Sequence, residues 1–365
     1  MSTWSNKLKL EIFGSSHGEN IGLNLYGIPK GYKIDMDKVQ EQMDRRAPGK
    51  TKRTTRRKEN DIPIITSGID KDNTTTGEVI TMTINNENAN SANYDNLKNT
   101  PRPGHADYTA YVKYGKDYDN SGGSVFSGRM TAPIVFAGQI CQQILKKLDI
   151  YIVAHISEIN GIKDKSIESI EDDSDIIERL KKSTFSIIDR NVERDMLRVV
   201  ESAMMSLDSI GGIIECGIFN MKEGYGGELF DGLESKFSNF LFAIPGVKGV
   251  EFGSGFSGSK IRGSKNNDEF TYKDGKVVTK TNNSGGILGG ISNGMPIVFR
   301  VAFKPTSSIG LEQHTVNLET KTDTTIKIKG KHDPCIVPRA VPVVESAAAI
   351  VLLDTILSEQ KEDLL

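Results

Sequence analysis

The sequence predicts an α+β fold for this 365-residue chain, and three observations support that prediction. Helix-like and strand-like segments are mixed without the regular strand–helix–strand alternation of a doubly wound sheet. No G-x-G-x-x-G segment follows a strand-like run, which argues against a dinucleotide-binding fold. Hydrophobic residues make up 37% and charged residues 26% of the chain, which is enough apolar content for a sizeable core.

Helical periodicity predicts the helices. Apolar residues recur at helical spacing in five segments: Asp35–Arg46, Pro133–Leu148, Val192–Met205, Phe230–Phe242 and Val343–Leu357. Asp35 is suited to cap the first of these, and Pro133 suits the first turn of the second. The charged stretch Ser166–Lys182 is expected to form one more helix on the surface.

Strand-like runs lie between these helices: Leu8–Phe13, Ile62–Ile65, Val79–Ile84, Tyr151–Ile159, Gly212–Phe219, Val247–Phe252, Ile297–Phe303 and Thr324–Ile328. Long polar loops are expected at 49–60, 85–100, 120–128, 254–285 and 304–314. Loops of that length inside a compact domain are usually binding or catalytic segments.

Composition and charge exclude several classes of protein. With 46 basic and 48 acidic residues, the chain has no overall attraction to nucleic acid or an acidic membrane. Its three cysteines lie far apart without a C-x-x-C spacing, which favours a reducing compartment. The N-terminus lacks the apolar segment of a signal peptide, and the longest apolar run is far shorter than the roughly 20 residues of a membrane span. We therefore expect a cytoplasmic protein.

Two turns flanked by glycine or proline contain a histidine. His17 lies in Phe13-Gly14-Ser15-Ser16-His17-Gly18, and His105 lies in Arg102-Pro103-Gly104-His105-Ala106-Asp107-Tyr108. Histidine can act as a general acid near neutral pH. A structural turn with a solvated histidine is the alternative interpretation of both motifs.

A cluster of eight cations contains no acidic residue: Arg45, Arg46, Lys50, Lys52, Arg53, Arg56, Arg57 and Lys58. Arginine pairs with phosphate or carboxylate through two parallel hydrogen bonds, so the cluster could bind a polyanion. A solvated loop and a nucleic-acid patch are the alternatives.

Three further segments are candidate sites. A glycine- and serine-rich loop at 120–131 leads into the helix at Pro133, and such loops can bind anions. Lys304–Ser308 combines one cation with hydroxyls, and the segment 330–335 combines lysine, histidine and carboxylate. No H-x-H or H-E-x-x-H pattern occurs, so we expect no metal site. A Ser-His-Asp hydrolase stays open as an alternative, although no G-x-S-x-G elbow occurs. The residues alone indicate an enzyme that binds a small polyanion and moves protons.

Twelve ordered motifs, from about residue 10 to about residue 354, resemble those of the chorismate synthase family. They include FG-x-SHG, RPGHADY, SGR-x-T, VKGVEFG-x-GF, GGI-x-GGISNG, KPTSSI, HDPC and RAVPVVE. The resemblance implies a 1,4-elimination of phosphate from 5-enolpyruvylshikimate 3-phosphate that gives chorismate and requires reduced FMN. It also implies one domain over 1–365, a β-α-β sandwich with helices between two antiparallel sheets, and a homotetramer.

The resemblance also implies a role for particular residues. His17 would protonate the leaving phosphate, His105 would stabilise the reduced flavin near N1, and Asp333 would help flavin N5 accept the substrate hydrogen. The implied substrate-binding residues are Ser16, Arg46, Lys52, Arg102 and Arg129. The implied FMN-binding residues are Phe126, Ser127, Gly128, Pro245, Gly246, Gly289, Lys304, Pro305, Thr306, Ser307, Ser308 and Lys331.

The chain departs from the family pattern in four places. Ser15 replaces a glutamate, the 120–130 loop lacks two arginines and a glutamate, and Lys331 and Lys52 stand where arginine is usual. A non-catalytic relative is therefore one alternative, and a nucleic-acid-binding protein is another. Two sources of reduced FMN also stay open at this point: the protein's own NAD(P)H-dependent reduction or a separate flavin reductase.

Overall fold

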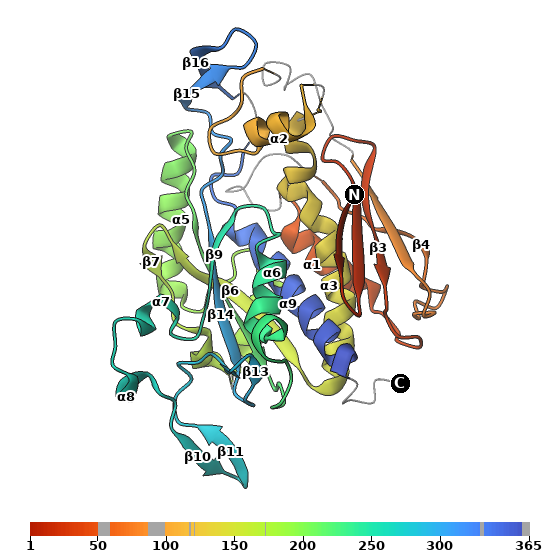
Figure 1. Cartoon of the computed structure of the whole chain (residues 1–365), viewed down its shortest axis with the longest axis vertical. Coiled ribbons are helices and arrows are strands. Elements are labelled where there is room, and N and C mark those ends of the chain that lie inside the picture. Colours follow the sequence, from red (N-terminus) through yellow and green to blue (C-terminus); the bar gives the residue numbers. More distant parts are fainter. Residues whose placement is uncertain are drawn as a thin grey trace.

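Two antiparallel sheets and a central group of helices form the fold in this computed structural model. The structure describes residues 1–49, 59–86, 99–116, 118–119, 121–171, 173–328 and 332–359. Figure 1 shows helices α1 (Met36–Arg46), α3 (Ala132–Leu145) and α9 (Val337–Glu359) between the sheets. The α+β class predicted from the sequence is confirmed.

The first sheet comes from the N-terminal part of the chain and has the order β1-β2-β3-β5-β4. Its strands are β1 (Ser2–Ser5), β2 (Lys9–Gly14), β3 (Asn20–Tyr26), β4 (Ile64–Ser67) and β5 (Ile80–Asn85). Ile21, Leu23 and Leu25 of β3 are fully buried, and the alternate residues point to the other face.

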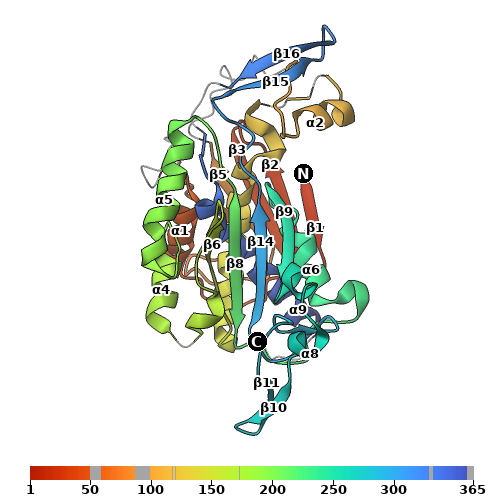
Figure 2. The same ribbon diagram turned by 90° about the vertical axis from the view of Figure 1, so that its left-hand side faces the viewer.

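The second sheet has the order β7-β6-β8-β14-β9. Its strands are β6 (Tyr151–Ile159), β7 (Ile162–Lys163), β8 (Gly212–Phe219), β9 (Val247–Phe252) and β14 (Ile297–Phe303). In Figure 2, β8, β14 and β9 run side by side in front of the central helices. Successive residues of a strand point to opposite faces of the sheet, so β6 contributes to two cores. Ile152 and Ala154 belong to the central core, whereas Val153 belongs to a smaller cluster on the outer face.

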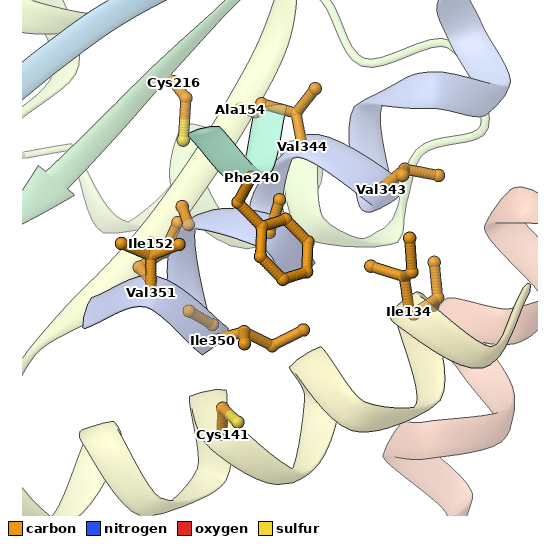
Figure 3. Close-up of a cluster of buried hydrophobic side chains, with 14 of the residues drawn as sticks. Ile134, Cys141, Ile152, Ala154, Cys216, Phe240, Val343, Val344, Ile350 and Val351 are labelled. Atoms are coloured by element: carbon orange, nitrogen blue, oxygen red, sulfur yellow. The ribbon is translucent and has the colours of Figure 1, made fainter. Parts of the chain in front are cut away.

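Helix α9 is buried along nearly its whole length. Its length and hydropathy would suit a membrane span, but 94% of its most apolar window is buried inside the protein. A helix that is hydrophobic all round belongs in a core, and Figure 3 shows Val343, Val344, Ile350 and Val351 of α9 in such a core. Gly138 lets α3 approach α9 closely, since a Cβ at this position would stand 2.2 Å from the Cβ of Ser346 in α9.

The other elements surround this centre. The remaining helices are α2 (Asp107–Tyr114), α4 (Ser174–Lys182), α5 (Arg190–Met205), α6 (Leu233–Leu241), α7 (Gly255–Gly258) and α8 (Gly263–Asn266). Three hairpins pair β10 (Phe270–Lys273) with β11 (Lys276–Thr279), β12 (Ile287–Leu288) with β13 (Ile291–Ser292), and β15 (Glu312–Asn317) with β16 (Thr322–Lys327). The short 3₁₀ helices are η2 (Ser121–Phe126), η3 (Gly128–Thr131), η4 (Lys146–Leu148), η5 (Ile167–Ile170) and η6 (Leu229–Asp231).

Some predicted boundaries are wrong. The stretch Ser166–Lys182 is not one helix, because Asp173 caps a new helix by accepting a hydrogen bond from the Ile176 N–H. Helix α9 begins at Val337 rather than Val343, and it continues through Pro342. The expected loop at 254–285 contains α7, α8 and the β10–β11 hairpin. Residues 49–60 and 85–100, also expected as loops, lie mostly outside the described residues.

A row of alternating charges crosses the second sheet. His155, Glu215, Arg300 and Glu251 occupy directly paired positions on β6, β8, β14 and β9. His155 is fully buried, with Nδ1 3.0 Å from Asp164 and Nε2 3.1 Å from Glu215. Burial alone would lower the pKa of His155, but the hydrogen bonds to these two carboxylates raise it above its ordinary value. The two carboxylates therefore favour the protonated imidazole in this row.

We predict that Gly138→Ala lowers the free energy of unfolding by about 1–3 kcal/mol, because the new methyl overpacks the contact with Ser346. The measurement is urea unfolding. Gly263→Ala is the control, since the nearest atom to its new Cβ lies 4.0 Å away, and its stability should change by less than about 1 kcal/mol. Equal effects of the two substitutions would contradict the close helix contact.

We also predict that stability falls as the pH rises through the raised pKa of His155. The folded protein holds this proton more tightly than the unfolded chain, so the contribution is full below about pH 6.5 and is lost above the folded-state pKa. Urea unfolding between pH 6 and 9 should give a smaller decline for His155→Gln than for the wild type. Identical slopes would rule out a charged His155.

Candidate functional site

A cavity of about 1230 Å³ opens where loops from both halves of the chain meet. Its wall includes His17, the end of α1, the segment before α2, and the loop that contains η2 and η3. The later part of the chain contributes residues 242–248 and 303–308, together with His332, Asp333, Ile336, Arg339, Ala340 and Val343. Cavities that hold a single drug-sized ligand are usually roughly 300–1,000 Å³, so this cavity has room for more than one small molecule.

The wall is strongly cationic although the whole chain has a net charge of −2. Among the described residues, six lysines and arginines line it: Arg46, Arg102, Arg129, Lys248, Lys304 and Arg339. Two carboxylates, Glu59 and Asp333, line it as well. A cleft lined mainly by one sign of charge concentrates ligands of the opposite sign.

His105 is held by a buried carboxylate and a buried guanidinium. Its Nδ1 lies 2.7 Å from Asp107 Oδ1, and Arg102 binds both oxygens of Asp107 at 2.7 Å. Burial would raise the pKa of Asp107, but hydrogen bonds from Arg102 and His105 hold it well below its usual range. Because an ionised Asp107 accepts the Nδ1 proton, Nε2 is the ring nitrogen left for other partners.

His17 lies against Gly122 and Gly123 of the loop that contains η2. Ser16 is fully buried, and its hydroxyl lies 3.1 Å from His17 Nδ1 and 3.3 Å from the Gly122 carbonyl. A Cβ at Gly122 would stand 1.7 Å from His17 Cε1, and one at Gly123 would stand 3.0 Å from His105 Nε2. Both glycines have a left-handed φ, +58° and +89°. The pair therefore contacts both histidines in a way that a side chain would prevent.

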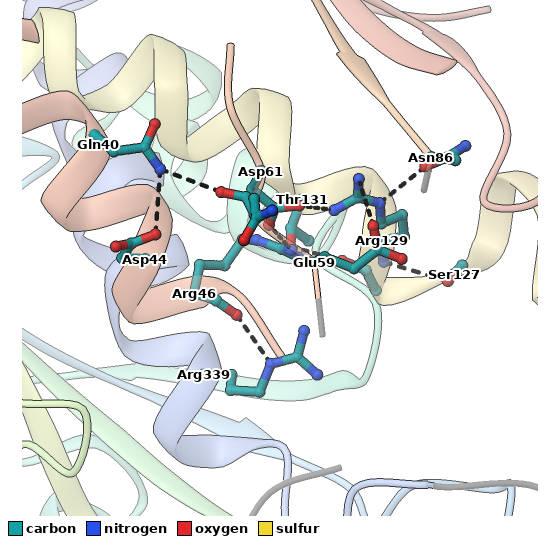
Figure 4. A network of polar contacts seen from close by, with 12 residues as sticks. Gln40, Asp44, Arg46, Glu59, Asp61, Asn86, Ser127, Arg129, Thr131 and Arg339 are labelled. Atoms are coloured by element: carbon teal, nitrogen blue, oxygen red, sulfur yellow. Dashed lines mark hydrogen bonds and ion pairs between the residues drawn. The ribbon is translucent and has the colours of Figure 1, made fainter. Parts of the chain in front are cut away.

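Buried arginines around the cavity are compensated by buried carboxylates (Figure 4). Asp61 forms ion pairs with both Arg46 and Arg129, and Glu59 lies 3.6 Å from Arg129. Burial lowers the pKa of Arg46 to about 10, although Asp61 opposes this. The two guanidiniums outweigh burial at Asp61 and lower its pKa to about 2. Within the described part of the chain, Arg46 Nε has no hydrogen-bond partner.

Asp333 is oriented by the first turn of α9. Its side chain forms an ion pair with Arg339, whose Nε donates to the Arg46 carbonyl at 2.9 Å. Thr306 Oγ1 donates to the Asp333 carbonyl at 2.8 Å. The aspartate thus joins α1, α9 and the loop after β14.

Glycine backbone, a lysine and aromatic rings also line the cavity. Gly246 has φ +94°, and its carbonyl accepts from the Lys304 N–H at 2.9 Å. Burial lowers the pKa of Lys304, and the nearby Lys248 adds to this. The rings of Tyr114 and Tyr118 stack at 5.0 Å, and Tyr118 lies 6.4 Å from Phe126.

Most residues assigned from the sequence line this one cavity: His17, Arg46, Arg102, His105, Phe126, Ser127, Gly128, Arg129, Pro245, Gly246, Lys304, Pro305, Thr306, Ser307, Ser308 and Asp333. Ser16 does not line it, because its side chain is buried behind His17. Gly289 does not line it either, since it lies in the turn between β12 and β13. Lys52 and Lys331 lie outside the described residues, as do Lys50, Arg53, Arg56, Arg57 and Lys58.

The nucleic-acid interpretation of the basic cluster fails for its two described members. Arg45 and Arg46 are 5% and 2% exposed, and both are paired with buried carboxylates. Phosphate backbones are bound by accessible cations. These two residues therefore belong to the interior and to the cavity wall rather than to a nucleic-acid surface.

Sequence reasoning missed the acidic partners and Arg339, and it gave His332 no role of its own. Asp107 and Arg339 lie inside the motifs RPGHADY and RAVPVVE, so these motifs could have indicated them. Asp61 and Glu59 follow the basic cluster without a motif of their own. His332 lines the cavity beside Asp333, and the motif HDPC contains it. None of the described residues forms a cluster of three His, Cys, Asp or Glu side chains that could hold a metal.

Comparisons with known proteins relate the whole chain to one family. The family model of chorismate synthase matches residues 8–357. A chorismate synthase of Dehalococcoides mccartyi is 44% identical over 98% of this chain and 97% of its own length. One from Thermococcus kodakarensis is 41% identical over 96% of both chains. A crystal structure of chorismate synthase superimposes with a TM-score of 0.73 and 25% identity, covering 98% of this chain and 93% of that one. The chain therefore belongs to the chorismate synthase family, the phosphate lyases that convert 5-enolpyruvylshikimate 3-phosphate to chorismate for aromatic amino acid biosynthesis.

Proposed function

We propose that the cavity is the active site in which 5-enolpyruvylshikimate 3-phosphate is converted to chorismate, with reduced FMN bound beside it. The observation that carries this proposal is the excess of cations around two fixed histidines and one fixed aspartate. The substrate has a phosphate and two carboxylates, and FMN has another phosphate. A wall whose described residues include six cations and two carboxylates suits such a pair of ligands.

The residues present fit a flavin. Glycine backbone at Gly104, Gly128 and Gly246 borders the cavity, and nothing lies within 4 Å of a Cβ placed at Gly128. We assign FMN binding to three segments that line the cavity. Their residues are Phe126, Ser127 and Gly128, then Pro245 and Gly246, then Lys304, Pro305, Thr306, Ser307 and Ser308. Reduced FMN supplies a ring that assists removal of the substrate hydrogen and undergoes no net oxidation. Gly289 is left out of this assignment because it lies in another turn.

Two histidines handle protons in this proposal. His17 donates a proton to the departing phosphate, and Ser16 together with Gly122 orients its ring from behind. Phosphate is a better leaving group once protonated, and imidazole exchanges protons readily near pH 7. His105 supports negative charge on the flavin, while Asp107 fixes the proton on its Nδ1.

Asp333 is the base that accepts the proton lost from the substrate ring, while His17 supplies the proton that leaves with the phosphate. Its ion pair with Arg339 and the Thr306 contact to its backbone limit where the carboxylate can point. Fixing a catalytic group in position before the reaction lowers the entropic part of the barrier.

The arginines bind the substrate without costly rearrangement. Arg46, Arg102 and Arg129 already lie in fixed positions against Asp61 and Asp107. The Nε–H of Arg46 still has no partner in the described residues, so it can donate to an anionic oxygen. Burial makes an additional anion favourable beside Arg46, because the guanidinium is only partly compensated.

We extend four family properties to this chain. We propose that the two sheets and the helices between them are the family's β-α-β sandwich, that residues 1–365 form one domain, and that four copies assemble. We also propose a cytoplasmic enzyme, consistent with three buried, free cysteines. Reduced FMN would come from a separate flavin reductase or from the protein's own NAD(P)H-dependent activity.

The direct test is an anaerobic assay with the substrate and dithionite-reduced FMN. We expect chorismate from the wild type and turnover at least about 10²-fold slower from Asp333→Asn, the lower end for loss of a proton-transfer group. Asp274→Asn, at the exposed tip of the β10–β11 hairpin, is the control and should keep the wild-type rate. Absence of chorismate from the wild type would identify a non-catalytic relative, and NADPH in place of dithionite tests self-reduction.

We further predict that Gly122→Ala lowers turnover by about 10²-fold, because a Cβ there displaces His17 and a misplacement of about 1 Å can have an effect of that size. Gly161→Ala is the matched control: φ is +86°, but nothing lies within 4 Å of its Cβ. It introduces the same kind of backbone strain away from the cavity. If both variants lose activity equally, contact with His17 is not the cause.

A further inference from the structure

We propose that His332 is a third histidine of the site and that its Nε2 forms a hydrogen bond with a neutral polar atom of the flavin ring. This inference rests on the proposed function. The inference gives His332 a contact with a ligand. The proposed function uses this residue neither for proton transfer nor for binding the phosphate and carboxylate groups.

The first argument is an unsatisfied atom. His332 lines the cavity, and its Nε2 is buried without a hydrogen-bond partner in the part of the chain that the structure describes. Leaving a buried polar atom unpaired is unfavourable, because it has lost its water without gaining another partner. Its neighbours differ in this respect, since Arg102 and Asp107 bind each other. The most direct explanation is that the partner of Nε2 is a bound ligand.

The second argument is position. His332 directly precedes Asp333 and lines the same cavity as Thr306 and Ser308. Thr306 is bonded to the Asp333 backbone, and Ser308 is bonded to Arg102 at 3.1 Å. This is the wall to which we assign the flavin. The ring of His332 therefore belongs to the flavin side of the cavity.

The third argument is charge. Burial lowers the pKa of His332 and the nearby Arg102 lowers it further, although Asp333 opposes them. The ring is thus neutral at neutral pH, with one nitrogen as donor and the other as acceptor. A phosphate or carboxylate would favour the charged ring, and the arginines already provide for those groups. A neutral imidazole suits the carbonyl oxygens and ring nitrogens at the flavin edge.

The experiment compares two substitutions of His332. His332→Phe keeps a ring of similar size and removes the hydrogen bond, whereas His332→Gln retains an amide that can reach a similar position. His314→Gln, on the exposed strand β15, is the control. The readouts are the Kd of oxidised FMN by fluorescence quenching, with and without substrate, the Kd of substrate alone, and the melting temperature of the ligand-free protein.

We expect His332→Phe to weaken FMN binding about tenfold, the effect of one lost hydrogen bond. Its ligand-free melting temperature should be unchanged or higher, because an unpaired polar atom has been removed from the interior. His332→Gln should bind FMN within about threefold of the wild type, since it keeps that hydrogen bond. His314→Gln should match the wild type in every readout.

Three results would overturn the inference. Wild-type FMN affinity in His332→Phe would remove the contact. A lower melting temperature in both His332 variants, with equal loss of affinity, would make the residue structural. If His332→Phe lost affinity for the substrate and kept its affinity for FMN, the ring would contact the substrate and not the flavin. If the wild type itself bound no FMN, the proposed function would fail together with the inference, whereas the first three results leave it intact.

Discussion

The structure depends on one constraint, the burial of α9 on every side between the two sheets. A helix without a polar face must be covered all round, so both sheets and α3 have to close on it. Gly138 allows that approach at Ser346. Glu345, the one buried carboxylate of its first turns, is neutralised by Arg45 of α1 at 2.7 Å and accepts the Ala154 N–H of β6 at 2.9 Å. Three elements distant in sequence are thereby fixed to the same helix.

The packing of α9 also fixes side chains of the site. Arg339 lies in the first turn of α9 and connects Asp333 to the backbone of Arg46 at the end of α1. Asp61 pairs with Arg46 and Arg129, and Asp107 pairs with Arg102. Removing one member of such a buried pair is strongly unfavourable, because the remaining charge stays buried. These four arginines are therefore held in place before any ligand arrives.

The loop at 120–130 departs from the family pattern, yet it keeps the feature that the histidines require. Gly122 and Gly123 present bare backbone to His17 and His105, and both need a left-handed φ. The aromatic ring of Phe126 borders the cavity in this loop. The loop thus contributes shape and bare backbone beside the two histidines, together with one cation of the wall, Arg129.

The sequence by itself determined the local elements and the family. Apolar spacing predicted α1, α3 and α5 to within a few residues, and β6, β8, β9 and β14 to the residue, because these patterns depend only on neighbours along the chain. The alternation of Ile21, Leu23 and Leu25 could have predicted β3 as well. Ordered motifs indicated the cavity residues, including both histidines and Asp333.

Tertiary structure decided which charges pair and which residues face the cavity. Ser16 is adjacent to His17 in sequence but lies behind it, and Gly289 lies in a remote turn despite its motif. Helix α9 continues through Pro342, because packing on all sides outweighs the local preference of proline to end a helix. The partners of Arg46 and Arg129 depend on where the chain brings Asp61. Burial makes these pairings obligatory, and burial is a property of the folded molecule that no local pattern encodes.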